Sequence, residues 1–222
     1  MIVAIDGPSG AGKSTLAKRV ARELGFTYLD TGAMYRALAL KILRQGLNLE
    51  DSEKLAELVD ATEIDLVESS GTLKVLLDGG NVSALIRTPE VSQMASKSSA
   101  FPVVRKRMLN LQRRLGKKGN VVAEGRDIGT VIFPHADVKI YLDASVEERA
   151  RRRYEELRKA GREVSFEDTV HEMEERDKRD SERELAPLRK AEDAVVIDSS
   201  ALDAEEVAET VLRVIQNKSL EN

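Results

Sequence analysis

The sequence predicts an α/β fold in which helices surround a central parallel sheet. Short apolar runs recur along the chain, and runs of this length are typical of buried strands. These runs are Ile2–Ile5, Tyr28–Leu29, Val121–Ala123, Val138–Leu142 and Ala194–Ile197. Most of them are separated by stretches in which apolar residues follow helical spacing. Such alternation of strands and helices favours a parallel sheet, because parallel strands are joined by crossover connections, usually helices.

The first predicted strand leads into Gly7-Pro8-Ser9-Gly10-Ala11-Gly12-Lys13-Ser14, which fits the phosphate-binding loop (P-loop) pattern G-x-x-x-x-G-K-[ST] at every fixed position. Behind it, Leu16, Val20, Ala21 and Leu24 follow helical spacing. Strand, glycine loop and helix are the context that this motif requires, which argues against a glycine-rich turn without a ligand. We therefore expect the chain to bind a nucleoside triphosphate. The expected nucleotide-binding residues are Gly7, Pro8, Ser9, Gly10, Ala11, Gly12, Lys13, Ser14 and Thr15.

The residue types of the P-loop follow from its chemistry. Glycines let the backbone curl so that successive N–H groups point at an anion. The N-terminus of the following helix adds partial positive charge. The Lys13 ammonium can bridge the β- and γ-phosphates, and the Ser14 hydroxyl can hold Mg²⁺. The motif thus predicts a site for a nucleotide together with Mg²⁺.

Bulk composition excludes several classes of protein. A chain of 222 residues can bury a sizeable core, and its net charge of −4 argues against a nucleic-acid partner held by bulk electrostatics. The absence of cysteine excludes a disulfide framework, and two distant histidines argue against a histidine metal site. No apolar run approaches a membrane span, and the N-terminus lacks the features of a signal peptide. We expect a cytoplasmic monomer with small-molecule substrates and no membrane partner.

One region interrupts the alternation of strands and helices. Its three predicted strands are Glu63–Val67, Thr72–Asp78 and Val82–Ile86. They are joined by Ser69-Ser70-Gly71 and Gly79-Gly80-Asn81, and short glycine-containing turns favour an antiparallel meander. We expect an insertion at about residues 60–98. The predicted core segments are 1–59, 99–144 and 186–222.

Two later helices have predicted starting points. Ser145 and Glu148 have the spacing of a capping box, and so do Asp203 and Glu206. The segment 145–190 carries charges of both signs at helical spacing. The default interpretation of such a pattern is a solvated helical face.

Arginines in two polar loops indicate a second phosphate site, because the guanidinium group can bind phosphate oxygens in pairs. Arg36 follows the strand end at Tyr28–Leu29, in a segment whose helix Asp30 or Thr31 can cap. Arg126 follows the predicted strand that ends at residue 123. Ligands of doubly wound sheets bind at the carboxyl ends of strands. We therefore expect both arginines to reach a ligand.

A third group of charges lies in the mixed-charge segment. At helical spacing, Arg176, Asp180 and Arg183 share one face. Glu124, close to Arg126 in sequence, can support a Mg²⁺ shell through water. Each lone arginine can instead be a surface charge, and the cluster can be a set of helical salt bridges. Taken together with the P-loop, these arginines favour an acceptor that itself carries a phosphate.

Phosphoryl transfer requires positive charge around a loose transition state. Lys13 and Mg²⁺ can supply part of that charge, and further candidates are Arg149, Arg152, Arg153 and Arg158. An acceptor that is already a phosphate needs no strong base. The absence of an evident histidine base fits that requirement.

Further motifs extend from Ile2 to about Ser200, which is nearly the whole chain. They are Ile5-Asp6-Gly7-Pro8-Ser9-Gly10-Ala11-Gly12-Lys13, Leu29-Asp30-Thr31-Gly32-Ala33-Met34-Tyr35-Arg36, Ile86-Arg87-Thr88, Ala100-Phe101-Pro102, Glu124-Gly125-Arg126-Asp127-Ile128-Gly129-Thr130-Val131, Phe133-Pro134, Glu175-Arg176-Asp177 through Asp180, and Ala186-Pro187-Leu188. This combination resembles bacterial cytidylate kinases and is far more specific than a P-loop alone. The resemblance implies a P-loop three-layer fold with a central parallel sheet, a small antiparallel β insertion for the acceptor nucleotide, and a helical lid at about residues 145–185.

The resemblance also implies a reaction, the transfer of the γ-phosphate of ATP to CMP or dCMP with Mg²⁺. It assigns catalytic roles to Lys13, Arg126 and Arg183. The implied CMP-binding residues are Thr31, Arg36, Ser96, Arg105, Arg126, Asp127, Arg176, Asp180 and Arg183. The expected Mg²⁺ contacts are the Ser14 hydroxyl, which the general P-loop motif supports, and Glu124 through a water molecule.

Within that set the resemblance divides the work. Arg36 and Arg126 would hold the CMP phosphate with Arg183 nearby, and two further residues, Arg176 and Asp180, would face the sugar. The residues implied to read the cytosine edge are Ser96, Arg105 and Asp127. A carboxylate facing the 4-position accepts from the cytosine amino group and disfavours uracil, which has a carbonyl there.

Two other hypotheses remain open at this stage. One is a small P-loop kinase for another monophosphate or for a metabolite alcohol, for which Asp30 or Asp127 would have to act as base. The other is a P-loop switch or a nucleic-acid-associated ATPase. A guanine-specific switch needs an N-K-x-D segment, and Asn217-Lys218-Ser219-Leu220 lacks the aspartate. The acceptor that raises ADP release distinguishes these hypotheses.

Overall fold

A computed structural model describes residues 1–69, 72–117 and 119–220. Its main sheet has five strands in the order β2-β6-β1-β7-β8. Their bounds are β1 Ile2–Asp6, β2 Thr27–Asp30, β6 Val121–Gly125, β7 Val138–Asp143 and β8 Val195–Asp198. Strand β1 pairs in parallel with β6 and β7, and β7 pairs in parallel with β8. The five predicted strands and the central parallel sheet are confirmed.

The chain divides into two compact units. The first comprises residues 1–28 and 119–222, and the second comprises residues 29–118. The division falls inside β2, whose first two residues, Thr27 and Tyr28, belong to the first unit. The Thr27 N–H donates to the carbonyl of Asn120 at 3.0 Å, immediately before β6.

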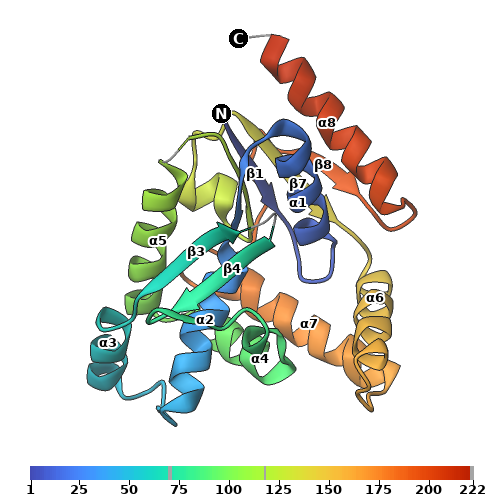
Figure 1. Ribbon diagram of the computed structural model, residues 1–222. Coiled ribbons are helices and arrows are strands. Elements are labelled where there is room, and N and C mark those ends of the chain that lie inside the picture. The colour runs from blue at the N-terminus through green and yellow to red at the C-terminus, as the bar shows by residue number, and fades with distance from the viewer. Residues whose placement is uncertain (70–71, 118, 221–222) are drawn as a thin grey trace. The chain divides into compact units, whose positions relative to one another are not determined.

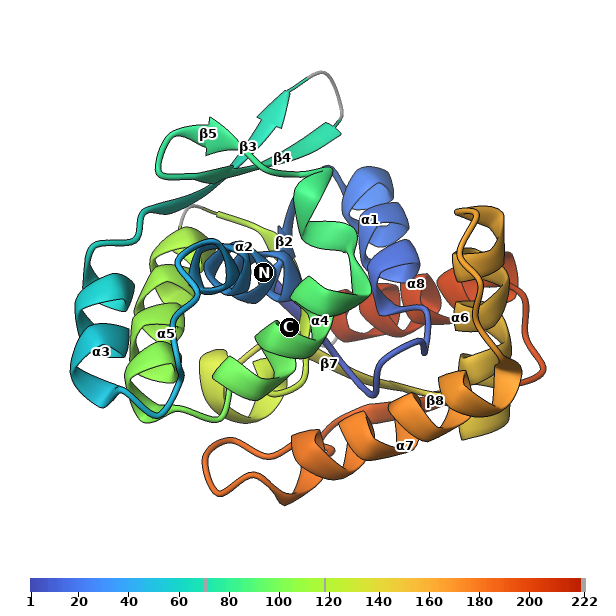
Figure 2. The ribbon, with the colours of Figure 1, turned by 90° about the horizontal axis from the view of Figure 1, so that it is seen from below.

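The first unit packs helices around the main sheet. Its helices are α1 Lys13–Leu24, α6 Val146–Lys159, α7 Phe166–Glu182 and α8 Ala204–Leu220. Helices α1 and α8 lie side by side, and so do α6 and α7 (Figures 1 and 2). The rings of Tyr154 on α6 and Phe166 on α7 meet edge to face. The centre of the core is β1, where Val3, Ala4 and Ile5 are fully buried.

The second unit combines helices with a three-stranded sheet in the order β3-β4-β5. Its helices are α2 Thr31–Arg44, α3 Ser52–Asp60, the 3₁₀ turn η1 Leu85–Arg87, α4 Pro89–Ser98 and α5 Pro102–Gly116. Its strands are β3 Ile64–Ser69, β4 Thr72–Leu77 and β5 Gly80–Asn81. Strands β3 and β4 are antiparallel, with Ile64 opposite Leu77. The predicted turn residues Ser70 and Gly71 lie outside the described residues.

The third predicted strand, Val82–Ile86, is wrong. The antiparallel partner of β4 is Gly80–Asn81, within the segment predicted as a turn, and a 3₁₀ turn follows at Leu85–Arg87. The Asn81 side chain accepts hydrogen bonds from the backbone N–H and the hydroxyl of Ser83, a local turn that competes with continuation of the strand. The apolar residues Val82 and Ile86 are buried nonetheless. Their pattern reflected burial rather than an extended backbone.

The predicted helix starts are confirmed. The Ser145 hydroxyl caps α6 by accepting from the Glu148 N–H at 3.2 Å. Asp203 and Glu206 form a reciprocal capping box ahead of α8, with both hydrogen bonds at 2.9 Å. Of the two proposed caps for α2, Asp30 is the N-cap. Among the described residues, no helix is long and apolar enough to cross a membrane.

Candidate active site

The P-loop lies between β1 and α1 and has glycine where no side chain fits. A Cβ atom on Gly7 would lie 2.0 Å from the carbonyl oxygen of Leu142, the neighbouring backbone of β7. A Cβ atom on Gly10 would lie 2.7 Å from the Met173 side chain and 3.1 Å from Arg149. Gly12 precedes α1 in the left-handed region and offers no capping side chain. The first N–H groups of α1 therefore have no side-chain cap, as an anion site at a helix N-terminus requires.

Lys13 is the buried cation of this loop. Its ammonium donates to the Pro8 carbonyl at 2.5 Å, so the side chain folds back across the loop. Burial and the nearby guanidinium groups of Arg126 and Arg176 together lower the pKa of Lys13 from 10.5 to about 7, against the opposing effect of Glu124. The loop is thus a site where positive charge is unfavourable until an anion compensates it.

Ser14 and Glu124 supply oxygen atoms beside Lys13. The Ser14 hydroxyl donates to the Glu124 carboxylate, which also accepts from the Tyr28 hydroxyl at 2.8 Å. A hydroxyl and a carboxylate are the hard oxygen donors that Mg²⁺ prefers, and Mg²⁺ at such sites takes its remaining ligands from phosphates and water. These residues fit the metal. Within the described chain, no group of three or more acidic, histidine or cysteine side chains forms a metal cage.

A network of charges joins the loop after β6 to the end of α7. Arg126 donates from Nε to Asp180 Oδ2 at 2.9 Å. Arg183, the C-cap residue of α7, lies 4.0 Å from Asp180 and 3.6 Å from Asp127. Burial opposes ionisation of Asp180, but Arg126, Arg176 and Arg183 together hold its pKa below the usual value. Asp180 therefore stays ionised and holds the arginines in place.

Asp6, which the sequence analysis did not single out, supports the same loop. Its two carboxylate oxygens accept from the N–H groups of Ile128 at 2.8 Å and Gly129 at 2.7 Å. These residues begin the short π-helical turn η2 Ile128–Ile132, which directly follows Asp127. Burial raises the pKa of Asp6 to about 6, although the two N–H groups oppose the rise. Its position at the end of β1, where an apolar run breaks, was the available signal.

The second unit holds the remaining predicted acceptor residues in two groups. In the first, Thr31 begins α2, and Arg36 on the same helix lies 3.4 Å from the Asp30 carboxylate. Asp30 also accepts from the Ala33 N–H at 2.7 Å, so it is engaged in capping and ion pairing. This arrangement makes it a support for Arg36.

The second group lies where α4 leads into α5. Ser96 is buried, and among the described residues its hydroxyl has no hydrogen-bond partner. Ser99 donates to the Ser96 carbonyl at 2.7 Å and accepts through its own carbonyl from Arg105 at 3.4 Å. Ser99 thus contacts both Ser96 near the end of α4 and Arg105 in the first turn of α5.

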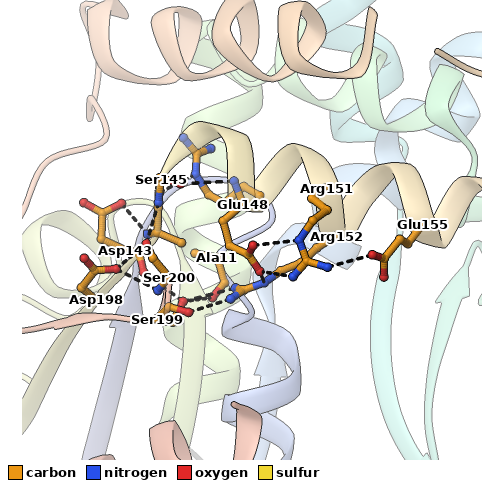
Figure 3. A network of polar contacts seen from close by, with 12 residues as sticks. Ala11, Asp143, Ser145, Glu148, Arg151, Arg152, Glu155, Asp198, Ser199 and Ser200 are labelled. Atoms are coloured by element: carbon orange, nitrogen blue, oxygen red, sulfur yellow. Dashed lines mark hydrogen bonds and ion pairs between the residues drawn. The ribbon is translucent and has the colours of Figure 1, made fainter. Parts of the chain in front are cut away.

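The four lid arginines of the sequence analysis have different environments. Arg149 is buried. Arg152 donates to the Ser199 carbonyl at 2.6 Å and to the Ser199 hydroxyl at 3.2 Å, and that hydroxyl donates to the P-loop carbonyl of Ala11 at 3.2 Å (Figure 3). Arg153 pairs with Glu156 on its own helix, and Arg158 is exposed.

Ser199 and Tyr28 are two further residues that sequence reasoning missed. Ser199 follows β8 and is 188 positions from Ala11, and Tyr28 is 96 positions from Glu124. Contacts of that sequence separation follow from strand order, which no local pattern encodes. For Tyr28 the only signal was its place on a predicted strand.

Comparison with known proteins agrees with this geometry. A family model described as cytidylate kinase matches residues 3–217. The cytidylate kinase of Carboxydothermus hydrogenoformans is 52% identical over 219 residues, which cover 99% of each chain. That of Bacillus subtilis is 50% identical over 217 residues, covering 98% of this chain and 97% of its own.

A solved structure supports the fold independently. An uncharacterized protein from Eubacterium ventriosum superposes with a TM-score of 0.55 at 12% identity, covering 97% of this chain and 98% of its own. Identity at that level bears on the fold alone. The family model, by contrast, spans nearly the whole chain. The two named relatives match this chain along nearly their full length. The chain therefore belongs to the cytidylate kinase family.

Proposed function

We propose that this protein transfers the γ-phosphoryl group of ATP to CMP or dCMP, giving ADP and the corresponding diphosphate. The observation that carries the proposal is the closeness of the P-loop lysine, Lys13, to the arginines Arg126 and Arg176. In the first unit, Lys13 lies close enough to Arg126 and Arg176 for their charges to lower its pKa. Such a concentration of buried and partly buried cations suits two phosphate groups that meet in line.

On the donor side, the P-loop N–H groups and Lys13 would bind the β- and γ-phosphates. Ser14, and Glu124 through water, would hold Mg²⁺, which when bound neutralises charge on the phosphate oxygens. Tyr28 would keep Glu124 in place through its hydroxyl. The expected nucleotide-binding set runs from Gly7 to Thr15.

On the acceptor side, Arg126 and Arg183 of the first unit and Arg36 of the second would bind the CMP phosphate. Arg176 and Asp180 would face the sugar, and Thr31 would contribute its hydroxyl. The acceptor phosphate is itself the nucleophile, so the chain needs to orient it rather than deprotonate it. Asp180 supports this step by fixing the arginine forks before the substrate arrives.

Recognition of cytosine would fall to Asp127, Ser96 and Arg105. A carboxylate at the 4-position accepts from the cytosine amino group, and Ser96 and Arg105 can donate to O2 and N3. The buried Ser96 hydroxyl, without a partner among the described residues, supports this role because a buried hydroxyl normally has one. We also propose that the protein acts as a monomer in the cytoplasm.

The test is an assay of ADP release with ATP and Mg²⁺ against separate acceptors. The panel is CMP, dCMP, UMP, AMP, GMP, shikimate and no acceptor. Turnover with CMP and dCMP, and little with the others, is the expected result. Turnover with another acceptor would overturn the cytosine assignments, and ADP release that needs no acceptor would overturn the kinase assignment.

A further inference from the structure

Arg149 on α6 has each of its three guanidinium nitrogens directed at a different element. Nε donates to the Ala144 carbonyl at 2.9 Å, just after β7. Nη1 donates to the Ser9 carbonyl of the P-loop at 3.1 Å. Nη2 forms an ion pair with Asp177 of α7 at 2.6 Å. The Arg149 side chain is only 6% exposed, so these contacts form with little competition from water.

The P-loop packs against the same helices. Gly10 lies against the backbone and Cβ of Arg149 and against the Met173 side chain of α7. The loop backbone is therefore in van der Waals contact with both α6 and α7. A shift of either helix would displace the loop.

The Ser9 carbonyl contact has a direct consequence for anion binding. In a P-loop the N–H groups must point toward the phosphates, so the carbonyls of the same peptides point away from them. A guanidinium that holds the Ser9 carbonyl outward fixes that orientation before the nucleotide binds. Such preorganisation is what makes a dipole array effective toward a developing charge.

Through its ion pair with Asp177, Arg149 also contacts α7, the helix that we assign to the acceptor site. Asp177 is adjacent in sequence to Arg176 and lies one helical turn before Asp180, and both of these residues face the arginine cluster. The charge of Asp177 also acts on Arg126. Fixing Asp177 therefore fixes the rotation of α7 that presents Arg176 and Asp180.

We propose that Arg149 is a positioning residue that couples the P-loop to the acceptor-binding face of α7. Each of its three guanidinium nitrogens is engaged, by Ala144, Ser9 and Asp177, so we assign its action to these partners and not to contact with the transferred phosphoryl group. The proposal rests on the proposed function, because it assigns α7 to the acceptor site. It replaces the expectation that Arg149 itself neutralises the transition state.

The experiment compares Arg149→Lys, Asp177→Asn and the double variant with the wild-type protein. Lysine keeps the charge but lacks the planar group that reaches three partners on different elements, and asparagine keeps the shape of Asp177 but removes its charge. Arg151→Ala is the matched control, because Arg151 lies on the same helix, is more than half exposed and pairs only with Glu148 and Glu155 among the contacts described. For each protein we would measure kcat, the KM for ATP, the KM for CMP and the midpoint of thermal unfolding.

We expect Arg149→Lys to lower kcat by about 10- to 100-fold and to raise both KM values, since a small misplacement of reacting groups has effects of that order. Asp177→Asn should raise the KM for CMP and lower kcat, with the KM for ATP within about twofold of wild type. The double variant should be no worse than Arg149→Lys, because the two side chains act through one contact. Arg151→Ala should match the wild type.

Three results would overturn the coupling role. The first is a folded Arg149→Lys variant with wild-type kcat and KM and only a lower unfolding midpoint. The second is a double variant whose losses multiply. The third is unchanged kinetics in Asp177→Asn, which decides the matter even if Arg149→Lys does not fold. A wild-type protein that uses a different acceptor would overturn the proposed function instead. The two single variants and the double variant would then be measured with that acceptor.

Discussion

Arg126 and Asp180 are 54 residues apart in the sequence, and Nε of Arg126 donates to the Asp180 carboxylate at 2.9 Å. This contact joins the end of a central strand to a helix that also contacts the P-loop. The Asp180 charge thus does more than balance Arg126, because Arg183 lies beside the same carboxylate. The pair organises the cations that the proposed reaction needs.

Replacement of Asp180 by asparagine should therefore disturb acceptor binding. Without the carboxylate, Arg126 and Arg183 repel each other and lose their fixed geometry, so we expect Asp180→Asn to raise the KM for CMP and to lower kcat by about 10²-fold. Steady-state kinetics with varied CMP measures both. Asp193→Asn is the control, because Asp193 is an exposed carboxylate that pairs with Lys139. Equal kinetics in the two variants would contradict the role given to Asp180.

Lys13→Met should separate catalysis from folding. The substitution removes the charge aimed at the β- and γ-phosphates, and loss of one such electrostatic contact costs at least about 10²-fold in kcat. The fold should survive, because the ammonium of Lys13 is unfavourable in the ligand-free loop. We would compare kcat, circular dichroism and thermal unfolding with those of Lys54→Met, an exposed lysine on α3. Retained activity in a folded Lys13→Met protein would exclude the P-loop assignment.

Asp127→Ala tests the assignment of base recognition. Removal of the carboxylate should lower kcat/KM for CMP far more than it changes the affinity for ATP, and it should reduce the preference for CMP over UMP. A buried polar contact to one substrate group is worth about 10²-fold or more in discrimination. The measurement is kcat/KM for both acceptors, with direct titration of an ATP analogue. If ATP affinity fell as much as CMP use, Asp127 would have to be placed elsewhere.

Asp6 gives a stability prediction with a defined sign. Its pKa is raised from 3.8 to about 6 in the folded protein, so the folded state binds more protons than the unfolded state between these values. The stability that Asp6 contributes is therefore fully present below pH 3.8 and declines as the pH rises to about 6. The stability advantage of wild type over Asp6→Asn, which does not titrate, should be larger at pH 5 than at pH 7.5. Urea unfolding at both pH values measures this, and a difference that does not change with pH would refute the assignment.

Much of the fold follows from local patterns in the sequence. The apolar runs locate the five parallel strands, and Ser145 and Asp203 mark the starts of α6 and α8. The third strand of the meander could not be located in this way, because the Asn81 side chain diverts the backbone while Val82 stays buried. A strand and a turn that packs against the core can show the same spacing of apolar residues in the sequence.

The candidate site was predictable only in part, for a related reason. The P-loop is contiguous in sequence, so its residues identify themselves. The Arg126–Asp180 contact and the three contacts of the Arg149 guanidinium join residues on different elements. These partners can be identified only when the arrangement of strands and helices is known. The roles of all the site residues in binding and catalysis stay predictions, as do the boundaries of the insertion and of the lid.

The lowered pKa of Lys13 has a consequence for the heat of nucleotide binding. At pH 7 a large fraction of Lys13 is unprotonated in the ligand-free protein, because its pKa is about 7. Polyphosphate stabilises the ammonium form, so binding must draw a proton from the buffer. Calorimetric titrations of an ATP analogue would then give enthalpies that vary with the ionisation enthalpy of the buffer. The affinity measured at neutral pH is thus lower than that of the protonated site, because binding must also protonate one lysine.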